Sequence, residues 1–107
     1  MILHTVNKSS FISQCLEDCL RRVSANDGVI LIEDGVFGSQ STSSASLISL
    51  QQSIAKSLDS AVCFYVLRPD FEARGLQPLP PDSPFELIDD DGFVELVLAA
   101  DKVLSWY

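Results

Sequence analysis

The residues best suited to chemistry in this sequence are three cysteines and one histidine. Cys15 and Cys19 lie four positions apart, Cys63 lies further along the chain, and His4 is close to the start. A thiolate is a strong nucleophile and can carry a transferred sulfur atom as a persulfide, provided that its pKa is low and solvent reaches it. A histidine acts as a general base only with a nucleophile or an orienting carboxylate in hydrogen-bonding reach. The surroundings of these four residues therefore decide whether any of them is catalytic.

The helix that carries two of the cysteines favours burial of Cys19. Ser9 or Ser10 can cap this helix, which is expected to run to about Val23. Cys19 falls near the centre of its apolar stripe and Cys15 at the edge; the stripe consists of Ile12, Cys15, Leu16, Cys19, Leu20 and Val23. A thiol on a buried face is inert, so spacing favours core packing over reactivity. Cys19 is nevertheless the candidate for sulfur handling, whereas Cys63, inside an apolar run, is expected to be plain core.

His4 is expected near the carboxyl end of a first strand, where Cys19 or Glu33 could lie close to it. A structural or interface role is favoured over catalysis for His4. With one histidine and no CxxC motif, a zinc site built from this chain alone is not expected. The acidic run 89–91 is better explained as a helix cap than as a cation site. Neither GxGxxG nor a P-loop is present, so no cofactor is predicted.

The elements that position these residues alternate between strands and helices. Such alternation predicts one α/β domain over residues 1–107, with a mostly parallel sheet of about five strands and helices on both faces. Chemistry in such folds gathers at the carboxyl ends of the strands, here 4–8, 33–38 and 68–70. The Ser-rich segment 38–46 is expected to be a mobile loop. The expected strands are 2–6, 29–32, 61–67, 85–88 and 103–106, and the expected helices are 9–23, 47–58, 71–74 and 92–100.

Charge and hydropathy restrict the partners of the chain. It carries 15 acidic and 7 basic residues, a net charge of −8, with no basic cluster, so direct nucleic-acid binding is disfavoured. No apolar run is long enough for a membrane span, and the start lacks a signal-peptide pattern, so a cytoplasmic location is expected. An odd number of cysteines also fits a reducing compartment. The 47% hydrophobic content of so short a chain predicts either a rich core or apolar surface that a partner covers.

Several segments, in order along nearly the whole chain, resemble the DsrH/TusB family. They are Ile-Leu-His-Thr-Val-Asn-Lys-Ser at 2–9, Leu16 with Cys19-Leu20, Leu-Ile-Glu-Asp-Gly-Val at 31–36, Tyr-Val-Leu-Arg-Pro-Asp at 65–70 with Ala-Arg-Gly at 73–75, Gly-Phe-Val-Glu-Leu at 92–96, and Ser105-Trp106. Each match is weak alone, and together they are specific.

The resemblance implies an accessory subunit of a heterohexameric sulfurtransferase complex that passes persulfide sulfur to a carrier protein. The implied partners are DsrE/TusD-like and DsrF/TusC-like sister subunits of similar fold, with a DsrC/TusE-like carrier. The main acceptor cysteine belongs to a sister subunit. The TusB branch serves 2-thiolation of the tRNA wobble uridine, and the DsrH branch serves dissimilatory sulfur oxidation. Cys19, which matches a cysteine in some DsrH-like members, and Val6-Asn7-Lys8 favour the DsrH branch.

The chain departs from the family pattern in two places. Ser10 replaces a common proline, and the segments 38–46 and 77–84 are longer than usual, so family interfaces are not carried over to them. Two other functions stay open from the sequence. One is a stand-alone thiol enzyme that uses Cys19 with His4, and the other is a purely structural interaction module.

Overall fold

Strands and helices alternate along the whole chain, as the sequence pattern predicts. The computed structural model describes residues 1–9, 14–43 and 48–106, with residues 41–43 and 48–53 described by their backbone alone. The elements are β1 (Ile2–Val6), α1 (Cys15–Leu20), β2 (Gly28–Leu31), the 3₁₀ helix η1 (Glu33–Ser43), α2 (Ile48–Asp59), β3 (Cys63–Leu67), α3 (Arg68–Ala73), β4 (Phe85–Ile88), α4 (Asp90–Ala99) and β5 (Lys102–Trp106).

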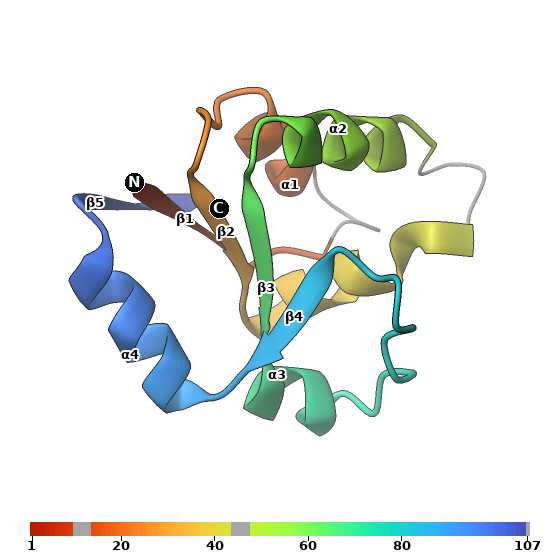
Figure 1. The fold of residues 1–107 in the computed structure, drawn as a ribbon. Coiled ribbons are helices and arrows are strands. Elements are labelled where there is room, and N and C mark those ends of the chain that lie inside the picture. Colours follow the sequence, from red (N-terminus) through yellow and green to blue (C-terminus); the bar gives the residue numbers. More distant parts are fainter. Residues whose placement is uncertain (10–13, 44–47, 107) are drawn as a thin grey trace.

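All five strands form one parallel sheet in the order β4-β3-β2-β1-β5. The chain moves from β1 to β4 in one direction and then returns across the sheet to place β5 beside β1. Right-handed crossovers in opposite directions put their helices on opposite faces. Accordingly, α1 and α2 lie on one face and α4 lies on the other (Figure 1). The predicted α/β class, with a parallel sheet and helices on both faces, is confirmed.

The main core lies between the sheet and the pair α1 and α2. The strand residues Val6, Leu31 and Val66 are fully buried on this face and belong to the same cluster as Leu16 and Ile54 of the helices. Because parallel strands in register point paired side chains to the same face, the alternate residues of each strand point to the α4 face. The central strands are therefore covered on both faces, which explains their continuous apolar runs.

Three elements differ from the prediction, and the first is α3, which begins at Arg68 instead of 71. The helix α1 covers only Cys15–Leu20 and ends there because the chain turns at 21–22. Gln14 and not Ser9 occupies its N-cap position, and the alternative cap Ser10 lies outside the described residues. The expected mobile loop at 38–46 is wrong where the structure describes it, since η1 extends to Ser43. Local hydrogen bonds explain η1: the Ser39 hydroxyl donates to the Val36 carbonyl at 2.7 Å, and Val36 is fully buried in the core.

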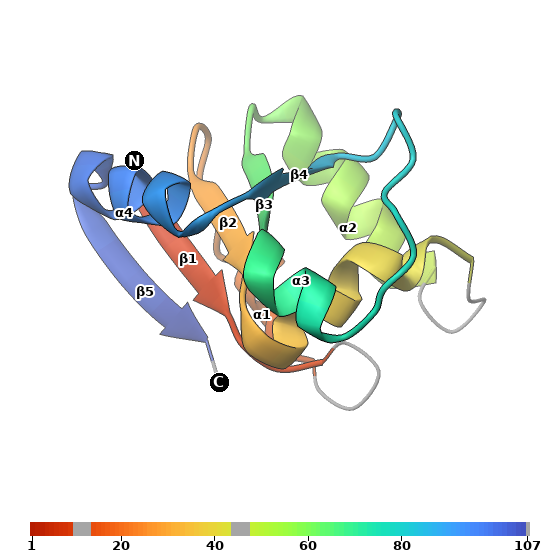
Figure 2. The same ribbon diagram turned by 90° about the horizontal axis from the view of Figure 1, so that it is seen from below.

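The turn after β2 depends on a glycine that lets two backbone segments meet. A Cβ atom on Gly35 would overlap the Val6 carbonyl oxygen, which is impossible without movement of the backbone. That carbonyl also accepts a hydrogen bond from the Ile32 amide at 3.0 Å. Gly35 therefore allows η1 to start directly against the end of β1. Seen from below, η1 and α3 lie together at this carboxyl edge of the sheet (Figure 2).

In the part of the chain that the structure describes, no helix has both the length and the apolar character needed to cross a membrane.

Candidate functional site

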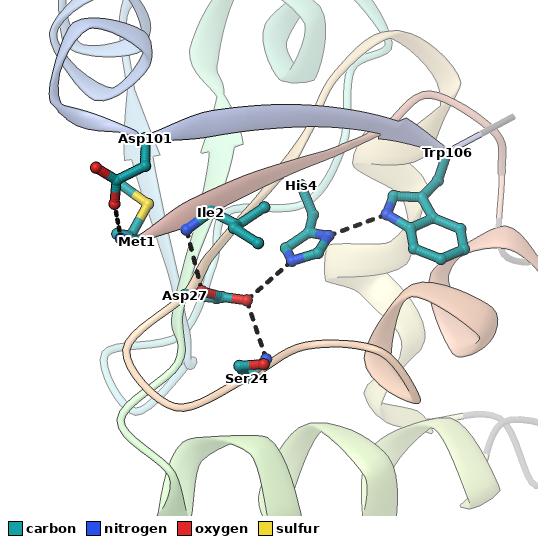
Figure 3. A network of polar contacts seen from close by, with 7 residues as sticks. All are labelled: Met1, Ile2, His4, Ser24, Asp27, Asp101 and Trp106. Atoms are coloured by element: carbon teal, nitrogen blue, oxygen red, sulfur yellow. Dashed lines mark hydrogen bonds and ion pairs between the residues drawn. The ribbon is translucent and has the colours of Figure 1, made fainter.

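A buried polar network centred on His4 joins three parts of the chain (Figure 3). His4 lies in the middle of β1 with 1% of its surface exposed, on the face that carries α1 and α2. Its Nε2 atom lies 3.1 Å from Oδ2 of Asp27, which directly precedes β2. The indole N–H of Trp106, at the end of β5, donates to Nδ1 of His4 at 3.0 Å. The network therefore connects β1, the turn before β2 and the edge strand β5.

The partners of His4 determine its tautomer. An indole N–H can only donate a hydrogen bond, so Nδ1 of His4 must be the acceptor and carry no proton. Nε2 then carries the proton and donates a hydrogen bond to the Asp27 carboxylate. The opposite tautomer would bring two N–H groups together at Trp106. His4 is thus held in one orientation with both ring nitrogen atoms engaged.

Asp27 is the acceptor on which this network converges. Besides His4, it accepts hydrogen bonds from the backbone amides of Ile2 at 3.0 Å and Ser24 at 2.9 Å. Burial alone would raise the pKa of Asp27, but the amides of Ser24 and Ile2 and the side chain of His4 outweigh burial and lower it. Asp27 is therefore an ionised carboxylate fixed in place, with its charge compensated by donors.

A histidine beside a buried carboxylate resembles two members of a catalytic triad, but the third position does not fit. Where a nucleophile would stand, His4 meets the Trp106 N–H, which cannot react. The ring is also closed to solvent, so a substrate cannot approach it. Neither Cys19 nor Glu33, the neighbours considered from the sequence, is the hydrogen-bond partner of His4. The arrangement supports the structural role predicted for His4.

The network has a mechanical role at the edge of the sheet. Four of the five residues of β5 are exposed, so side-chain burial contributes little to holding this strand. Polar side-chain contacts with β1 contribute instead: Trp106 binds His4, and the Thr5 and Ser105 hydroxyls lie 3.3 Å apart. These contacts fix β5, and with it the end of α4.

Cys19 lies on the buried face of α1, as its position in the apolar stripe predicts. Its exposed fraction is 0%, and it belongs to the main core cluster. Burial, and to a lesser extent the negative charge of Asp27, raises the pKa of Cys19 to about 12. The thiol is therefore protonated at neutral pH and is closed to solvent. This is the opposite of what a sulfur acceptor requires.

Cys63 is exposed, and the expectation that it is plain core is wrong. It is the first residue of β3 and pairs with Gly28, so it points to the α4 face of the sheet, near the amino ends of the strands. Helix α4 covers that face less completely than α1 and α2 cover theirs. Cys63 contacts Tyr65, whose pKa is raised by burial and then by the neighbouring Cys63 and Glu86. Among the described residues around this thiol, neither Tyr65 nor Glu86 supplies the positive charge that stabilises a thiolate.

The carboxyl ends of the strands, where a ligand was expected, are held by contacts within the chain. Glu33 has the left-handed φ of 49°, and its amide donates to the Asp70 carboxylate at 2.7 Å. Arg74 pairs with Asp34 at 3.0 Å and donates to the Asp70 carbonyl at 3.1 Å. These groups attach α3 to the end of β2. Their charges are used for this attachment and do not converge on an open cavity.

A pocket of about 320 Å³ lies between α1 and α2 and is lined by Leu20, Arg21, Val23 and Lys56. It contains two cations but no nucleophile or general base. No group of three or more His, Cys, Asp or Glu side chains in the described ranges is arranged to hold a metal ion.

The sequence signals for the His4 network are present but incomplete. The turn pattern at 26–28 identifies Asp27 only as a turn residue. Trp106 is singled out only because Ser105-Trp106 resembles the end of the DsrH/TusB sequences. Neither residue has a local pattern that connects it to His4, from which they lie 23 and 102 positions away. Only the order of the strands, with β5 beside β1, brings Trp106 to His4.

Comparison with known proteins gives a consistent result over the whole chain. Residues 8–103 match a family model described as DsrH like protein. The chain is 34% identical to Protein TusB of Pectobacterium parmentieri over 105 residues, covering 98% of this chain and 100% of that protein. It is 35% identical to Protein TusB of Pectobacterium atrosepticum over the same length. Protein TusB of Erwinia tasmaniensis is 34% identical over 107 residues.

The fold also has a counterpart among solved structures. The crystal structure of the ychN protein from E. coli superposes with a TM-score of 0.79 and covers 97% of both chains, at 20% sequence identity. At this identity the match concerns the fold, and it agrees with the five-stranded parallel sheet described above.

Proposed function

The chain belongs to the DsrH-like family, and we propose on this basis that it is an accessory subunit of a complex that relays persulfide sulfur to a carrier protein. The observation that carries the proposal is the family match over residues 8–103, together with full-length relatives named Protein TusB. In the proposed assembly the chain acts as a single domain over residues 1–107, in the cytoplasm. Its partners are DsrE/TusD-like and DsrF/TusC-like sister subunits in a heterohexamer, and a DsrC/TusE-like carrier receives the sulfur.

The chemistry of the cysteines supports an accessory role. A sulfur acceptor needs a thiolate within reach of the donor and of the carrier. Cys19 is buried with a pKa of about 12, Cys15 is partly buried and packs against the core, and Cys63 is exposed beside Tyr65. The acceptor cysteine is therefore assigned to a sister subunit, as the family resemblance implies.

The two branches of the family differ in the pathway served. In the sequence, Cys19 and Val6-Asn7-Lys8 favour the DsrH branch, but the burial of Cys19 speaks against a role in sulfur handling and so weakens that preference. The curated relatives carry the name TusB. We therefore favour the TusB branch, in which the relayed sulfur serves 2-thiolation of the tRNA wobble uridine. Dissimilatory sulfur oxidation is the alternative pathway.

A stand-alone thiol enzyme is the second function considered from the sequence, and the geometry speaks against it. That enzyme would need His4 to deprotonate Cys19. Both ring nitrogens of His4 are engaged by Asp27 and Trp106, and both Cys19 and His4 are closed to solvent. A purely structural interaction module is compatible with these contacts. It differs from the proposed subunit in one respect: sulfur transfer would not depend on the complex that it forms.

Co-expression tests the proposal. The tagged chain is produced with its DsrE/TusD-like and DsrF/TusC-like counterparts from the same genome, purified through the tag and analysed by native mass spectrometry. We expect one assembly that contains all three chains in equal number and transfers sulfur to the carrier. Recovery of the tagged chain alone, with no sister subunit bound under any salt condition, would contradict the proposal.

A further inference from the structure

The α4 face of the molecule carries exposed apolar side chains that the fold does not cover. No residue of α4 is buried, although Phe93 and Leu96 are half-buried against the sheet. Val94 and Leu98 are 56% and 79% exposed, and Val97 is exposed beside them. These three residues follow the spacing i, i+3, i+4, so they share one flank of the helix. We refer to Val94, Val97 and Leu98 as the α4 patch.

The patch continues toward the edge of the sheet. Val103 follows α4 by four residues, is exposed, and pairs with Leu3, which points to the α4 face. Figure 1 shows α4 and β5 together at one side of the molecule, away from α1 and α2. The pairing of β5 with β1 and the hydrogen bond from Trp106 to His4 hold this region in place. The result is a pre-formed apolar surface of the kind that marks protein interfaces.

Acidic residues surround the α4 patch. Residues 89–106 contain five acidic residues and one lysine, a net charge of −4, which is half of the chain's −8. Asp90, Asp91 and Glu95 are exposed, and none of them forms an ion pair with the described residues. Asp89 is engaged in capping α4 through the Gly92 amide, and Asp101 is paired with the Met1 amino group. Three uncompensated carboxylates therefore flank the apolar surface.

This charge pattern distinguishes between two possible partners for the α4 patch, a second copy of the chain and a different polypeptide. A second copy that docked through the same patch would bring its own carboxylates against these, and like charges placed together oppose association. A partner with an apolar face and a rim of Lys or Arg would instead pair with Asp90, Asp91 and Glu95. We propose that the α4 patch, with its acidic rim, is the docking surface for a different polypeptide that presents an apolar face flanked by basic residues.

This inference rests on the proposed function, because it assigns the contact with a sister subunit to one surface. The test uses the co-expressed complex described above, with Leu98→Glu and Val94→Glu as variants on the patch. Leu58→Glu is the matched control, because Leu58 is 43% exposed on α2, on the opposite face. All three side chains are exposed, so each variant should keep the wild-type melting temperature.

We expect Leu98→Glu and Val94→Glu to lower the affinity for the sister subunit by about tenfold or more, as truncation of a buried interface anchor does, while Leu58→Glu leaves it unchanged. Glu95→Lys should weaken binding and reduce its dependence on salt, since it removes one side of a charge pair. A complex that forms equally well with every variant would overturn the inference and leave the proposed function intact. Absence of any complex with the wild-type chain would remove the proposed function as well. A stable dimer of the chain alone, broken by Leu98→Glu but not by Leu58→Glu, would overturn the inference in favour of a second copy.

Discussion

Replacement of Asp27 by asparagine provides a sharp test of the buried network around His4. Asparagine has nearly the same shape, and its oxygen can keep the hydrogen bond from the Ile2 amide. In that orientation its NH₂ group faces two donors, the Ser24 amide and the Nε2–H of His4; in the flipped orientation it faces the Ile2 amide alone, so at least one buried donor loses its acceptor. His4 cannot adapt by changing its tautomer, because its Nδ1 must accept from Trp106.

The magnitude follows from the number of donors that lose their acceptor. A buried donor left without a partner costs about 1–3 kcal/mol, so the loss of at least one acceptor predicts a decrease of about 1–3 kcal/mol in the free energy of unfolding. Domains of this size are stable by roughly 5–15 kcal/mol in total, so the variant should unfold at a markedly lower urea concentration. The measurement is urea unfolding followed by circular dichroism, with an unchanged m-value as evidence that only stability has changed.

The matched control is Asp101→Asn, which removes a carboxylate from the exposed pair with the Met1 amino group. This variant should leave the urea midpoint unchanged within error, because exposed pairs contribute little.

A double mutant tests the role of the His4 tautomer. With Trp106→Phe, Nδ1 of His4 no longer has to accept from an indole, so Nε2 can become the acceptor for the side-chain amide that the Asp27→Asn substitution introduces. Asp27→Asn should therefore cost less in the Trp106→Phe background than in the wild type.

The pH dependence of the stability tests the role of the Asp27 carboxylate independently. The pKa of Asp27 is lower in the folded chain than in the unfolded chain. Its contribution is therefore fully present above the ordinary Asp pKa of about 3.9 and is lost as the pH falls through the lower folded value. The stability gap between wild type and Asp27→Asn should narrow over that acidic range. If Asp27→Asn matches Asp101→Asn at neutral pH, or costs the same with and without Trp106, the network has been assigned wrongly.

Three further predictions concern other parts of the chain. Brief treatment of the folded chain with iodoacetamide should label Cys63 and leave Cys19 unmodified until the chain unfolds, because Cys19 is closed to solvent with a pKa of about 12, and peptide mass spectrometry reads the labelling; labelling of Cys19 as fast as Cys63 would contradict the burial. Gly35→Ala should destabilise by roughly 3 kcal/mol or more, since its Cβ would meet the Val6 carbonyl, whereas Gly75→Ala, with a φ of 59° but no atom within 4 Å, should cost only about 1–2 kcal/mol in the same urea assay. Filter binding at physiological salt should detect no affinity of the isolated chain for tRNA, because of its −8 charge, and a micromolar Kd would refute this.

Much of the fold could be predicted because its strongest signals are local. The apolar run at 29–32 indicates a buried strand, and alternation with helices implies a parallel sheet. The stripe on α1 places Cys19 in the core for the same reason: a helical period is visible in a short window. The proposed sulfur-relay complex rests on the family resemblance, because no local sequence pattern indicates it.

The failures have physical causes that act over longer distances. The serines of 38–43 predict a mobile loop, because hydroxyl groups favour loops on average, yet Ser39 bonds to Val36 and continues a 3₁₀ helix. The apolar neighbours of Cys63 predict a core position, but the first residue of a strand on the thinly covered α4 face stays exposed. The partners of His4 depend on strand order, which the sequence pattern alone leaves open.

The central claim is that this chain supports sulfur relay without carrying the sulfur on its own thiols. The most direct measurement is the sulfur loading of the carrier protein, by intact mass spectrometry, when the assembled complex contains Cys19→Ser in this chain. We expect transfer close to the wild-type rate, with a lowered melting temperature because a hydroxyl replaces a buried thiol, whereas loss of the sister subunit's acceptor cysteine should abolish transfer. If Cys19→Ser stops transfer while the melting temperature of the complex is unchanged, Cys19 is a relay site and the account is contradicted.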